Sequence, residues 1–374
     1  MQIHFDKDLP LIDIDASLFI EDTPLLDVRA EVEFDQGAFV QAINSPLLTN
    51  QERHEVGIRY KEAGQDEAIE LGAQLITDEI RQQRVARWVE FVQANPKGVL
   101  YCFRGGMRSK ITQQWIFEYS GIKYPRINGG YKALRRFLIE SNERLIAERP
   151  LLLVSGSTGS GKTRFLEKIP FSVDLEGLAN HRGSAFGAMA TPQPTQINFE
   201  NNLAVDLLKH EANFLNKRVV LEDEGHNIGG VHLPMALPKR MATSPIVHLK
   251  VSDEERLQTS LQVYATDMLA DYQNNYAEEL AFEKFSEAIL GSLGRIKKRL
   301  GGERYRRLKQ LAEQALLDHK KTGNGEAHIA WVSELLVDYY DPMYEYQLSK
   351  KTERIVFVGN QQEIIEYLED EQLT

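Results

Sequence analysis

Residues 99–109, VLYCFRGGMRS, hold the one cysteine of a chain of 374 residues. Two arginines and two glycines follow this cysteine within six positions. Nearby cations favour a thiolate, and glycines let backbone N–H groups turn toward an anion. With Ser109 as the expected cap of a following helix, the stretch predicts a reactive cysteine that binds a tetrahedral oxyanion. The residues that carry this prediction are Cys102, Arg104, Gly105, Gly106 and Arg108.

A second motif lies at residues 156–163, which read GSTGSGKT and match the phosphate-loop pattern G-x-x-x-x-G-K-[ST]. A strand-like LLLVS precedes it and a helix-like TRFLEKI follows. Backbone N–H groups and the helix N-terminus would surround a di- or triphosphate. Lys162 would reach its terminal oxygens, and Thr163 would bind Mg²⁺ where that ion is present. The glycines that allow this turn are Gly156, Gly159 and Gly161.

The apolar run VVLEDEG, residues 219–225, ends in the acids Glu222, Asp223 and Glu224. Acids at a strand end beside a phosphate loop can hold Mg²⁺ or its waters, although an ordinary acidic turn has the same letters. We take Asp223 as the supporting residue, and the sequence leaves open which of the three acts. The sequence has no guanine-specific or protein-kinase motif, so the loop indicates a bound phosphate group rather than a reaction.

A basic run covers residues 295–309, RIKKRLGGERYRRLK, with eight basic residues against one glutamate. The net charge of the chain is −11, which argues against nucleic-acid binding by the whole surface. The run is either a solvated helical face or a local contact surface for a phosphate backbone. The candidate nucleic-acid contacts are Arg295, Lys297, Lys298, Arg299, Arg304, Arg306, Arg307 and Lys309.

Composition indicates a globular protein of two domains, because 374 residues exceed one typical domain. Hydrophobic residues make up 42% and charged residues 26% of the chain, which are ordinary values. The sequence contains no apolar run long enough for a membrane span, and its first residues lack the features of a secretion signal. A single cysteine forms neither an internal disulfide nor a multi-cysteine metal site. These features favour a reducing cytoplasm, and no metal centre is predicted.

Short apolar runs alternate with helix-like segments along most of the chain, which predicts an α/β fold with parallel sheets. We expect a parallel-sheet domain at residues 1–140 and a phosphate-loop α/β domain at 141–374. Residues 252–341 form the expected helical, basic part of the second domain, with GSLG and LGGER as interruptions. The predicted strands lie at residues 25–30, 42–47, 98–103, 151–156, 219–225, 246–251 and 355–360.

The first domain resembles a rhodanese domain, on the segments LLDVRAEVEFDQGAFVQAINSPLL, VLYC and INGGYKALR. The resemblance implies that Asp27 and Arg29 support an early strand and its turn, and that Cys102 carries a persulfide or related adduct. Many single-domain rhodaneses have C-x-x-G-x-R, whereas five residues separate Cys102 from Arg108 here. That spacing resembles the C-x5-R loop of tyrosine-phosphatase-like enzymes and indicates an oxyanion as large as phosphate.

A rhodanese-like domain followed by a phosphate loop, together with DLEGLANHRGSAFG at 174–187, resembles the tRNA 2-selenouridine synthase family. That family uses selenophosphate to replace the sulfur of wobble 2-thiouridine in tRNA by selenium. It also transfers a geranyl group from geranyl diphosphate to the same sulfur, and the S-geranyl nucleoside is regarded as an intermediate. The resemblance implies tRNA, selenophosphate and geranyl diphosphate as partners, no tightly bound cofactor and no membrane.

The resemblance also implies a division of roles between the two loops. The phosphate loop, chiefly Lys162, would bind the diphosphate of the prenyl donor. Arg104 and Arg108 would hold the phosphate of selenophosphate, and Cys102 would accept or guide selenium. His181 and Arg182 would act near the diphosphate or the nucleotide, although a purely structural loop is the alternative. The basic run would contact the tRNA backbone.

Two other functions fit parts of the sequence. The first is a phosphatase or sulfurtransferase of the rhodanese or tyrosine-phosphatase type, fused to an ATP-binding domain. Tyr101 stands where tyrosine phosphatases commonly have a histidine before the cysteine, which disfavours the phosphatase. The second is an RNA-binding regulator without catalysis, which would tolerate Cys102→Ser.

Overall fold

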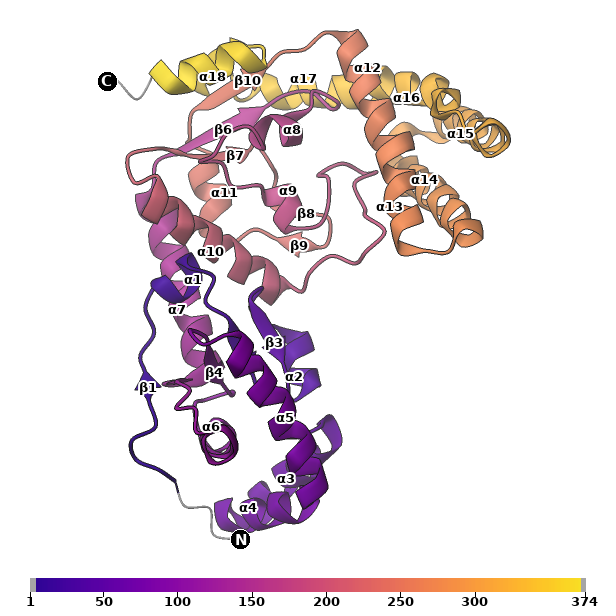
Figure 1. The fold of residues 1–374 in the computed structure, drawn as a ribbon. Helices are drawn as coiled ribbons and strands as arrows, with labels where there is room; N and C mark the ends of the chain where they lie inside the picture. The colour runs from indigo at the N-terminus through magenta and orange to yellow at the C-terminus, as the bar shows by residue number, and fades with distance from the viewer. Residues whose placement is uncertain (1–4, 371–374) are drawn as a thin grey trace. The chain divides into compact units, whose positions relative to one another are not determined.

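The protein is described by a computed structural model that covers residues 5–370, and its fold is mixed α/β with two separate parallel sheets (Figure 1). The described chain up to Leu145, together with Glu200–Ala212, forms the first compact unit. Ile146–Phe199 and the described residues from Asn213 onward form the second. The expected α/β class with parallel sheets is confirmed. The domain boundary that we expected after residue 140 falls within a continuous helix, α7 (Gly130–Glu148).

The sheet of the first unit has the strand order β1-β5-β4-β2-β3, with every neighbouring pair parallel. Its central strands β4 and β2 are fully buried, as expected where helices cover both faces of a parallel sheet. Its strands are β1 (Leu11–Ile12), β2 (Leu25–Asp27), β3 (Ala42–Asn44), β4 (Val99–Tyr101) and β5 (Arg126–Ile127).

One break divides the helical residues 65–94 of the first unit. They form two helices because Ile76 leaves the helical conformation and Thr77 caps the second helix through its hydroxyl. The helices between the described N-terminus and α7 are α1 (Ser17–Ile20), α2 (Glu31–Gln36), α3 (Asn50–Ala63), α4 (Gln65–Leu75), α5 (Asp78–Ala94) and α6 (Met107–Ser120).

The sheet of the second unit has the order β11-β10-β6-β7, and its neighbouring pairs are parallel. The phosphate-loop motif follows β6, whose residues are all buried, and leads into the short helix α8 (Lys162–Leu166). The predicted strand–loop–helix context of the motif is therefore confirmed. The strands of this sheet are β6 (Leu151–Ser155), β7 (Val219–Glu222), β10 (Ile246–Leu249) and β11 (Ile355–Gly359).

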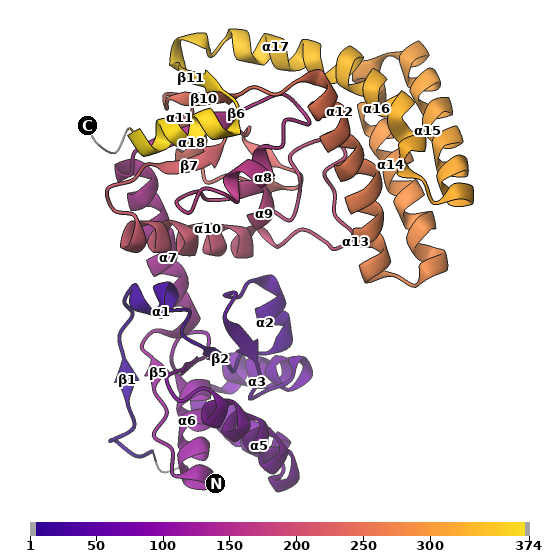
Figure 2. The same cartoon turned by 45° about the horizontal axis from the view of Figure 1, so that its top comes forward.

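The second unit holds the predicted helical region, in which α14, α15 and α16 pack beside one another (Figure 2). The expected interruption at GSLG is wrong, because Gly291 and Gly294 lie within α14 and the intervening Ser292 and Leu293 are buried. Core packing outweighs the helix cost of two glycines, about 1 kcal/mol each. The chain breaks at Gly301, whose φ of +81° suits glycine.

The helices of this region include two π-helical turns, η1 and η3. Its main elements are α12 (Asp253–Leu261), η1 (Gln262–Asp267), α13 (Met268–Asn275), α14 (Glu278–Leu300), α15 (Gly302–Thr322), α16 (Ile329–Leu335), η3 (Leu336–Tyr340) and α17 (Asp341–Ser349). The other α-helices that follow α8 are α9 (Leu175–Leu178), α10 (Gln196–Asn213), α11 (Ala236–Met241) and α18 (Gln361–Asp370). A hairpin joins β8 (Asn227–Ile228) and β9 (Val231–His232).

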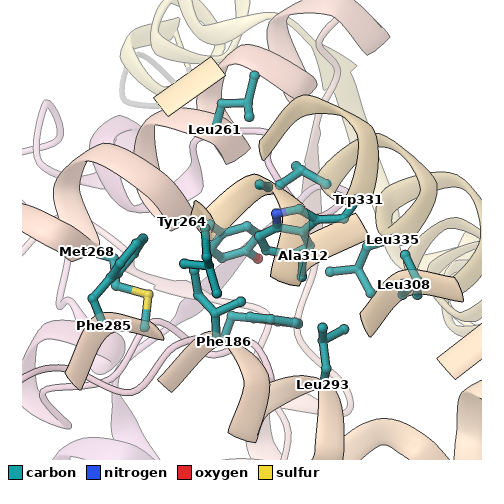
Figure 3. Packing of buried hydrophobic residues seen from close by; sticks show 14 of the residues in the cluster. Phe186, Leu261, Tyr264, Met268, Phe285, Leu293, Leu308, Ala312, Trp331 and Leu335 are labelled. Carbon is teal, nitrogen blue, oxygen red and sulfur yellow. The ribbon is translucent and has the colours of Figure 1, made fainter. Parts of the chain in front are cut away.

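Phe186 inserts the loop after α9 into the core of the helical region (Figure 3). Its ring is 1% exposed and lies 5.4 Å from the Tyr264 ring and 5.5 Å from the Trp331 ring, centroid to centroid. The loop therefore takes its position from η1 and α16, which are distant in the sequence.

We predict that Phe186→Ala lowers the free energy of unfolding of the second unit by about 3–5 kcal/mol, the usual cost of removing a buried aromatic ring. Urea unfolding followed by circular dichroism measures this loss. Tyr346→Ala is the control, because Tyr346 is an aromatic residue with 63% exposure and its removal should change stability by no more than about 0.5 kcal/mol. Equal effects of the two variants would contradict the anchoring role of Phe186.

Candidate functional site

The cysteine loop of the first unit is supported by a chain of buried charges. Arg29 is 1% exposed, forms an ion pair of 2.6 Å with Asp27, and donates to the carbonyls of Glu33 and Gly37. Its guanidinium also lies 3.8 Å from the centroid of the Tyr131 ring. Asp27 and Arg29 thus fix the turn that leads into α2, and burial keeps both away from any substrate.

That turn places Glu33 against the cysteine loop. Glu33 forms an ion pair with Arg108 at 2.5 Å and with Arg53 at 3.0 Å. Burial opposes the charged form of the Glu33 carboxyl, but the hydrogen bond and charge of Arg108 outweigh it and lower its pKa. The Arg108 guanidinium therefore has a carboxylate partner, whereas Arg104 is exposed, with its guanidinium 5.9 Å from the Phe103 ring. Of the two arginines expected to hold an oxyanion, Arg104 is the accessible one.

Cys102 itself is 3% exposed, and its Sγ donates to Ser109 Oγ at 3.2 Å. The expectation that Ser109 caps the following helix is wrong. Gly106 is the N-cap of α6 and makes no side-chain cap bond, while the Ser109 hydroxyl, within the first turn, donates to the Gly106 carbonyl at 3.0 Å. Ser109 thus links the sulfur to the turn that begins α6.

The glycines of this loop allow a close approach of two backbone segments. Gly130, at φ +58°, lies against the loop so tightly that a Cβ there would be 2.2 Å from the Cys102 carbonyl oxygen and 2.4 Å from the Gly105 nitrogen. The Tyr131 N–H donates to the Cys102 carbonyl at 2.8 Å. Arg126 donates to the Gly105 carbonyl at 3.0 Å. It is a third arginine at the loop, and no motif in the sequence pointed to it.

In the second unit, the phosphate loop folds back on its own lysine. Lys162 Nζ donates to the Gly156 carbonyl at 2.5 Å, and Gly159 and Gly161 have φ values of +82° and +78°. A Cβ at Gly159 would lie 2.3 Å from Ser260 Oγ. The backbone conformation therefore requires glycine at positions 159 and 161, and close packing also requires it at position 159.

Two carboxylates lie beside this loop, and one of them, Glu176, is a residue that sequence reasoning missed. Thr163 Oγ1 donates to Glu176 Oε2 at 3.0 Å. Burial, and then the charge of Glu224, raise the pKa of Glu176 to about 7, while Lys162 opposes the shift. Burial also raises the pKa of Glu224. Among the residues from 5 to 370, no group of three or more His, Cys, Asp and Glu side chains is arranged to hold a metal ion.

The other two acids near the end of β7 have different partners. Asp223, which we selected from the sequence, forms an ion pair with Lys351 at 2.6 Å. Glu222 is fully buried and accepts from the Leu175 N–H at 3.0 Å, and burial raises its pKa well above the ordinary value. Of the three candidate acids, Glu224 is therefore the one that faces Lys162 and Glu176.

A cavity of about 640 Å³, cavity one, opens above the phosphate loop. Its polar lining residues include those of the loop, Glu176 and Glu224. Arg182, which donates to the Val263 carbonyl at 3.0 Å, also lines it. The rest of its wall includes the apolar or aromatic residues Val263, Tyr264, Tyr340, Met343, Tyr344 and Leu348. Cavity one thus combines an anion-binding loop with several apolar and aromatic lining residues.

The segment 181–187 divides between two cavities. Arg182 lines cavity one. His181 instead lines a neighbouring hollow of about 520 Å³, which we call cavity two. Gly183, at φ +54°, contributes to both cavities, and a Cβ there would lie 2.1 Å from Glu176 Oε1. This glycine permits the loop to pass directly over the buried carboxylate.

The basic run is a helix–turn–helix corner rather than one helical face, because α14 ends at Leu300 and α15 begins at Gly302. The corner brings cations of both helices together at its exposed end. Arg307 pairs with Glu334 at 2.9 Å and Lys309 with Glu313 at 3.4 Å, whereas Arg295 and Arg299 line cavity two. Lys297, Lys298, Arg304 and Arg306 are exposed.

A parallel sheet with a phosphate loop after β6 and acids near the end of the adjacent β7 defines the second unit as a phosphate-loop α/β protein. Residues 149–374 match the family model described as the tRNA 2-selenouridine synthase AAA domain. The chain is 50% identical over 353 residues to a tRNA 2-selenouridine synthase of Marinobacter nauticus. The matched region covers 94% of this chain and 95% of the relative. This chain belongs to the tRNA 2-selenouridine synthase family.

Other relatives give the same result. A tRNA 2-selenouridine synthase of Pseudomonas fluorescens is 48% identical over 94% of this chain and 95% of its own length. One of Hahella chejuensis is 49% identical over 94% of this chain and 92% of its own. A crystal structure of the N-terminal domain of a putative ATP/GTP binding protein from Clostridium difficile 630 is 33% identical, with a TM-score of 0.32, over 34% of this chain and 98% of that domain.

We predict that Glu176 makes the stability of the metal-free protein fall between pH 6 and pH 8. The pKa of Glu176 is raised from 4.5 to about 7 on folding, so its favourable contribution is complete below pH 4.5 and is lost as the pH rises through 7. The loss between pH 6 and pH 8 amounts to about 1 kcal/mol. Thermal unfolding in EDTA should show this pH dependence in the wild type and much less in Glu176→Gln.

Glu254→Gln is the matched control for that experiment, because Glu254 is exposed on α12 and should leave the wild-type pH dependence intact. An equal pH dependence in wild type and Glu176→Gln would show that the raised pKa of Glu176 is not coupled to folding.

Proposed function

We propose that this protein is an enzyme that exchanges the sulfur of wobble 2-thiouridine in tRNA for selenium, by way of an S-geranyl intermediate. Cavity one carries the proposal. It joins a diphosphate-binding loop to an apolar wall with Val263, Met343 and Leu348, and this combination suits a prenyl diphosphate. The names of the relatives support tRNA as the substrate. Among residues 5–370 there is no helix that could span a membrane.

In the first step, the thiocarbonyl sulfur of the nucleoside attacks C1 of geranyl diphosphate. The C–O bond breaks and the diphosphate leaves with the electron pair. Lys162 and the N–H groups of the loop stabilise the charge that develops on the leaving group, and such preorganised groups act most strongly where water is excluded. This step uses no nucleotide hydrolysis and no tightly bound cofactor.

A magnesium ion fits the polar end of cavity one. The Thr163 hydroxyl and the carboxylates of Glu176 and Glu224 are oxygen donors, which Mg²⁺ prefers. Burial raises the pKa of both carboxyls although Lys162 lies nearby, so a further cation there would favour their charged forms. Bound there, Mg²⁺ would neutralise charge on the diphosphate. Asp223 would act indirectly, because its carboxylate pairs with Lys351.

In the second step, selenium of selenophosphate attacks C2 of the S-geranyl nucleoside, and the C–S bond breaks to release geranyl thiol. Hydrolysis of the P–Se bond releases phosphate. We assign this step to the cysteine loop, with Arg104 as the accessible cation for the phosphate and Cys102 guiding selenium. Arg108 orients the loop through its ion pair with Glu33 rather than holding the phosphate alone.

We predict that the two steps separate in variants of the two loops. Lys162→Ala should lower the rate of geranylation at least ~100-fold, the usual loss when a group that stabilises the transition state is removed. Cys102→Ala should form the geranylated nucleoside but incorporate no selenium. Mass spectrometry of the wobble nucleoside, after incubation of 2-thiouridine tRNA with geranyl diphosphate and selenophosphate, measures both products.

Lys168→Ala is the matched control, because Lys168 is an exposed lysine near the end of α8 that bonds to Gln361. It should behave like the wild type. No mass change with the wild-type protein would overturn the proposal and favour a cysteine phosphatase or sulfurtransferase. Release of phosphate that depends on Cys102 would then indicate the phosphatase, and transfer of sulfane sulfur by Cys102 the sulfurtransferase.

The corner between α14 and α15 is the proposed contact surface for the tRNA backbone, because its cations are gathered at one exposed place. We predict that Arg306→Ala with Arg307→Ala weakens tRNA binding and reduces the slope of log Kd against log salt by about 1–2. Titrations at several salt concentrations measure the slope. Lys320→Ala with Lys321→Ala, at the opposite end of α15, should leave it unchanged, and an equal change in both double variants would argue against this surface.

A further inference from the structure

Cavity two has no role in the chemistry proposed above. Its volume of about 520 Å³ lies within the range of about 300–1,000 Å³ typical of small-molecule sites. It shares Gly183, Ser184, Tyr340 and Met343 with cavity one. Cavity two is therefore directly adjacent to the phosphate-loop cavity.

Aromatic and apolar side chains form one part of cavity two. Tyr339 is half-buried, and its ring lies 5.0 Å from the Tyr340 ring in an edge-to-face arrangement. Met343 and Ile296 add apolar surface. A flat ring with apolar neighbours is the usual platform on which a nucleic-acid base stacks.

Two residues that line cavity two have buried polar atoms without a hydrogen-bond partner among residues 5–370. Tyr340 is 3% exposed, and its hydroxyl has no hydrogen-bond partner of suitable geometry among the described residues, although it lies near Ser184 and Tyr264. The Nδ1 atom of His181 is likewise buried without a partner in the described chain. Burial, and then the charge of Arg295, lower the pKa of His181, so that its ring is neutral near pH 7. Such groups can bond to the edge of a base.

Two arginines mark the open side of cavity two. Arg295 and Arg299 are four residues apart on α14 and therefore lie on the same face of the helix. Arg295 is held in place by the Ala185 carbonyl at 3.0 Å and by Ser292 Oγ at 2.7 Å, and Arg299 is exposed. Both belong to the basic corner, so the cavity opens beside the proposed backbone surface.

This set of groups suits a nucleotide better than a prenyl chain. A hydrocarbon gains nothing from two guanidinium groups and an unpaired imidazole nitrogen, whereas a nucleotide uses each of them along with the aromatic platform. The apolar wall of cavity one already offers a prenyl group a place beside the phosphate loop.

We propose that cavity two receives a single pyrimidine nucleotide splayed out of the RNA loop, with its base against Tyr339 and its phosphate at Arg299. The proposal rests on the proposed function, because it takes that nucleotide to be the wobble 2-thiouridine. Bases of single-stranded loops are recognised in this splayed form. The position would bring the sulfur to the shared wall and toward the prenyl donor of cavity one.

The test is equilibrium binding of the full-length protein to a fluorescent anticodon stem-loop, without geranyl diphosphate or selenophosphate. One RNA carries 2-thiouridine at the wobble position and the other an abasic site. We expect the wild type to bind the 2-thiouridine RNA about tenfold more tightly, as stacking of one base implies. Tyr339→Ala should lose most of that preference, and Tyr339→Phe, which keeps the ring, should retain it.

Tyr346→Ala is the matched control, because Tyr346 is exposed, lies against Lys350 and lines neither cavity, and it should retain the preference. A wild type that does not distinguish the two RNAs would overturn the proposal, as would a preference that survives Tyr339→Ala. Binding of a non-hydrolysable geranyl diphosphate analogue provides a second readout. If Tyr339→Ala weakens binding of the analogue and leaves the preference for the 2-thiouridine RNA intact, cavity two holds the prenyl chain and the proposal is wrong.

The outcome is separate from that of the proposed chemistry. A base preference that depends on Tyr339 would support cavity two even if no geranylated or selenated nucleoside formed, and in that case only the proposed function would fall. Conversely, product formation without the preference would remove the nucleotide from cavity two alone.

Discussion

The pair of buried carboxylates beside the phosphate loop is the constraint on which the second unit depends. Glu176 is buried and Glu224 is half-buried, and the two lie close enough to interact, so their two negative charges are costly without compensation. Lys162 supplies one positive charge, and Thr163 donates one hydrogen bond. The remaining deficit is met by a proton, as the pKa of about 7 indicates, or by a cation that arrives with a phosphate ligand.

This constraint explains the shape of the segment 174–187. Asp174 caps α9 by accepting from the Gly177 N–H, so Glu176 enters the site at a fixed place. The chain then returns over the carboxylates through Gly183, where no side chain would fit, and is secured by Phe186 in the helical core. The segment therefore acts as one piece that joins the phosphate loop to the wall of both cavities.

The sequence predicted the features that depend on local chemistry and missed those that depend on distant partners. The phosphate loop could be recognised because glycines with positive φ and the lysine that follows them lie within eight consecutive residues. The strands were visible as short apolar runs, since both faces of a parallel sheet are buried. The continuation of α14 through GSLG was missed because packing of Leu293 decides it, and that information lies in other helices.

The same division holds for the two sites. Arg108 looked like a free cation for an oxyanion, but its partner Glu33 lies 75 residues earlier in the chain, and no spacing rule connects them. Glu176 was overlooked because an isolated glutamate in a helical turn resembles any surface acid until Thr163 is brought to it. Asp223 was selected from the correct strand end, yet the side chain that turns toward Lys162 is that of its neighbour Glu224.

Two irregular helical turns supply tyrosines to the cavities, with Tyr264 lining cavity one and Tyr340 lining both. Tyr264 lies in η1 and Tyr340 in η3, and π-helical turns recur at functional sites because an extra residue in a turn redirects the side chains. Their hydroxyls lie near Ser184, on the loop that covers the carboxylates. In the proposed geranylation, the attacking sulfur, the prenyl C1 atom and the leaving oxygen must lie on one line while water is kept out. Because Gly183, Ser184, Tyr340 and Met343 line both cavities, the cationic, nucleotide-sized hollow is adjacent to the anion-binding loop, as such an approach requires.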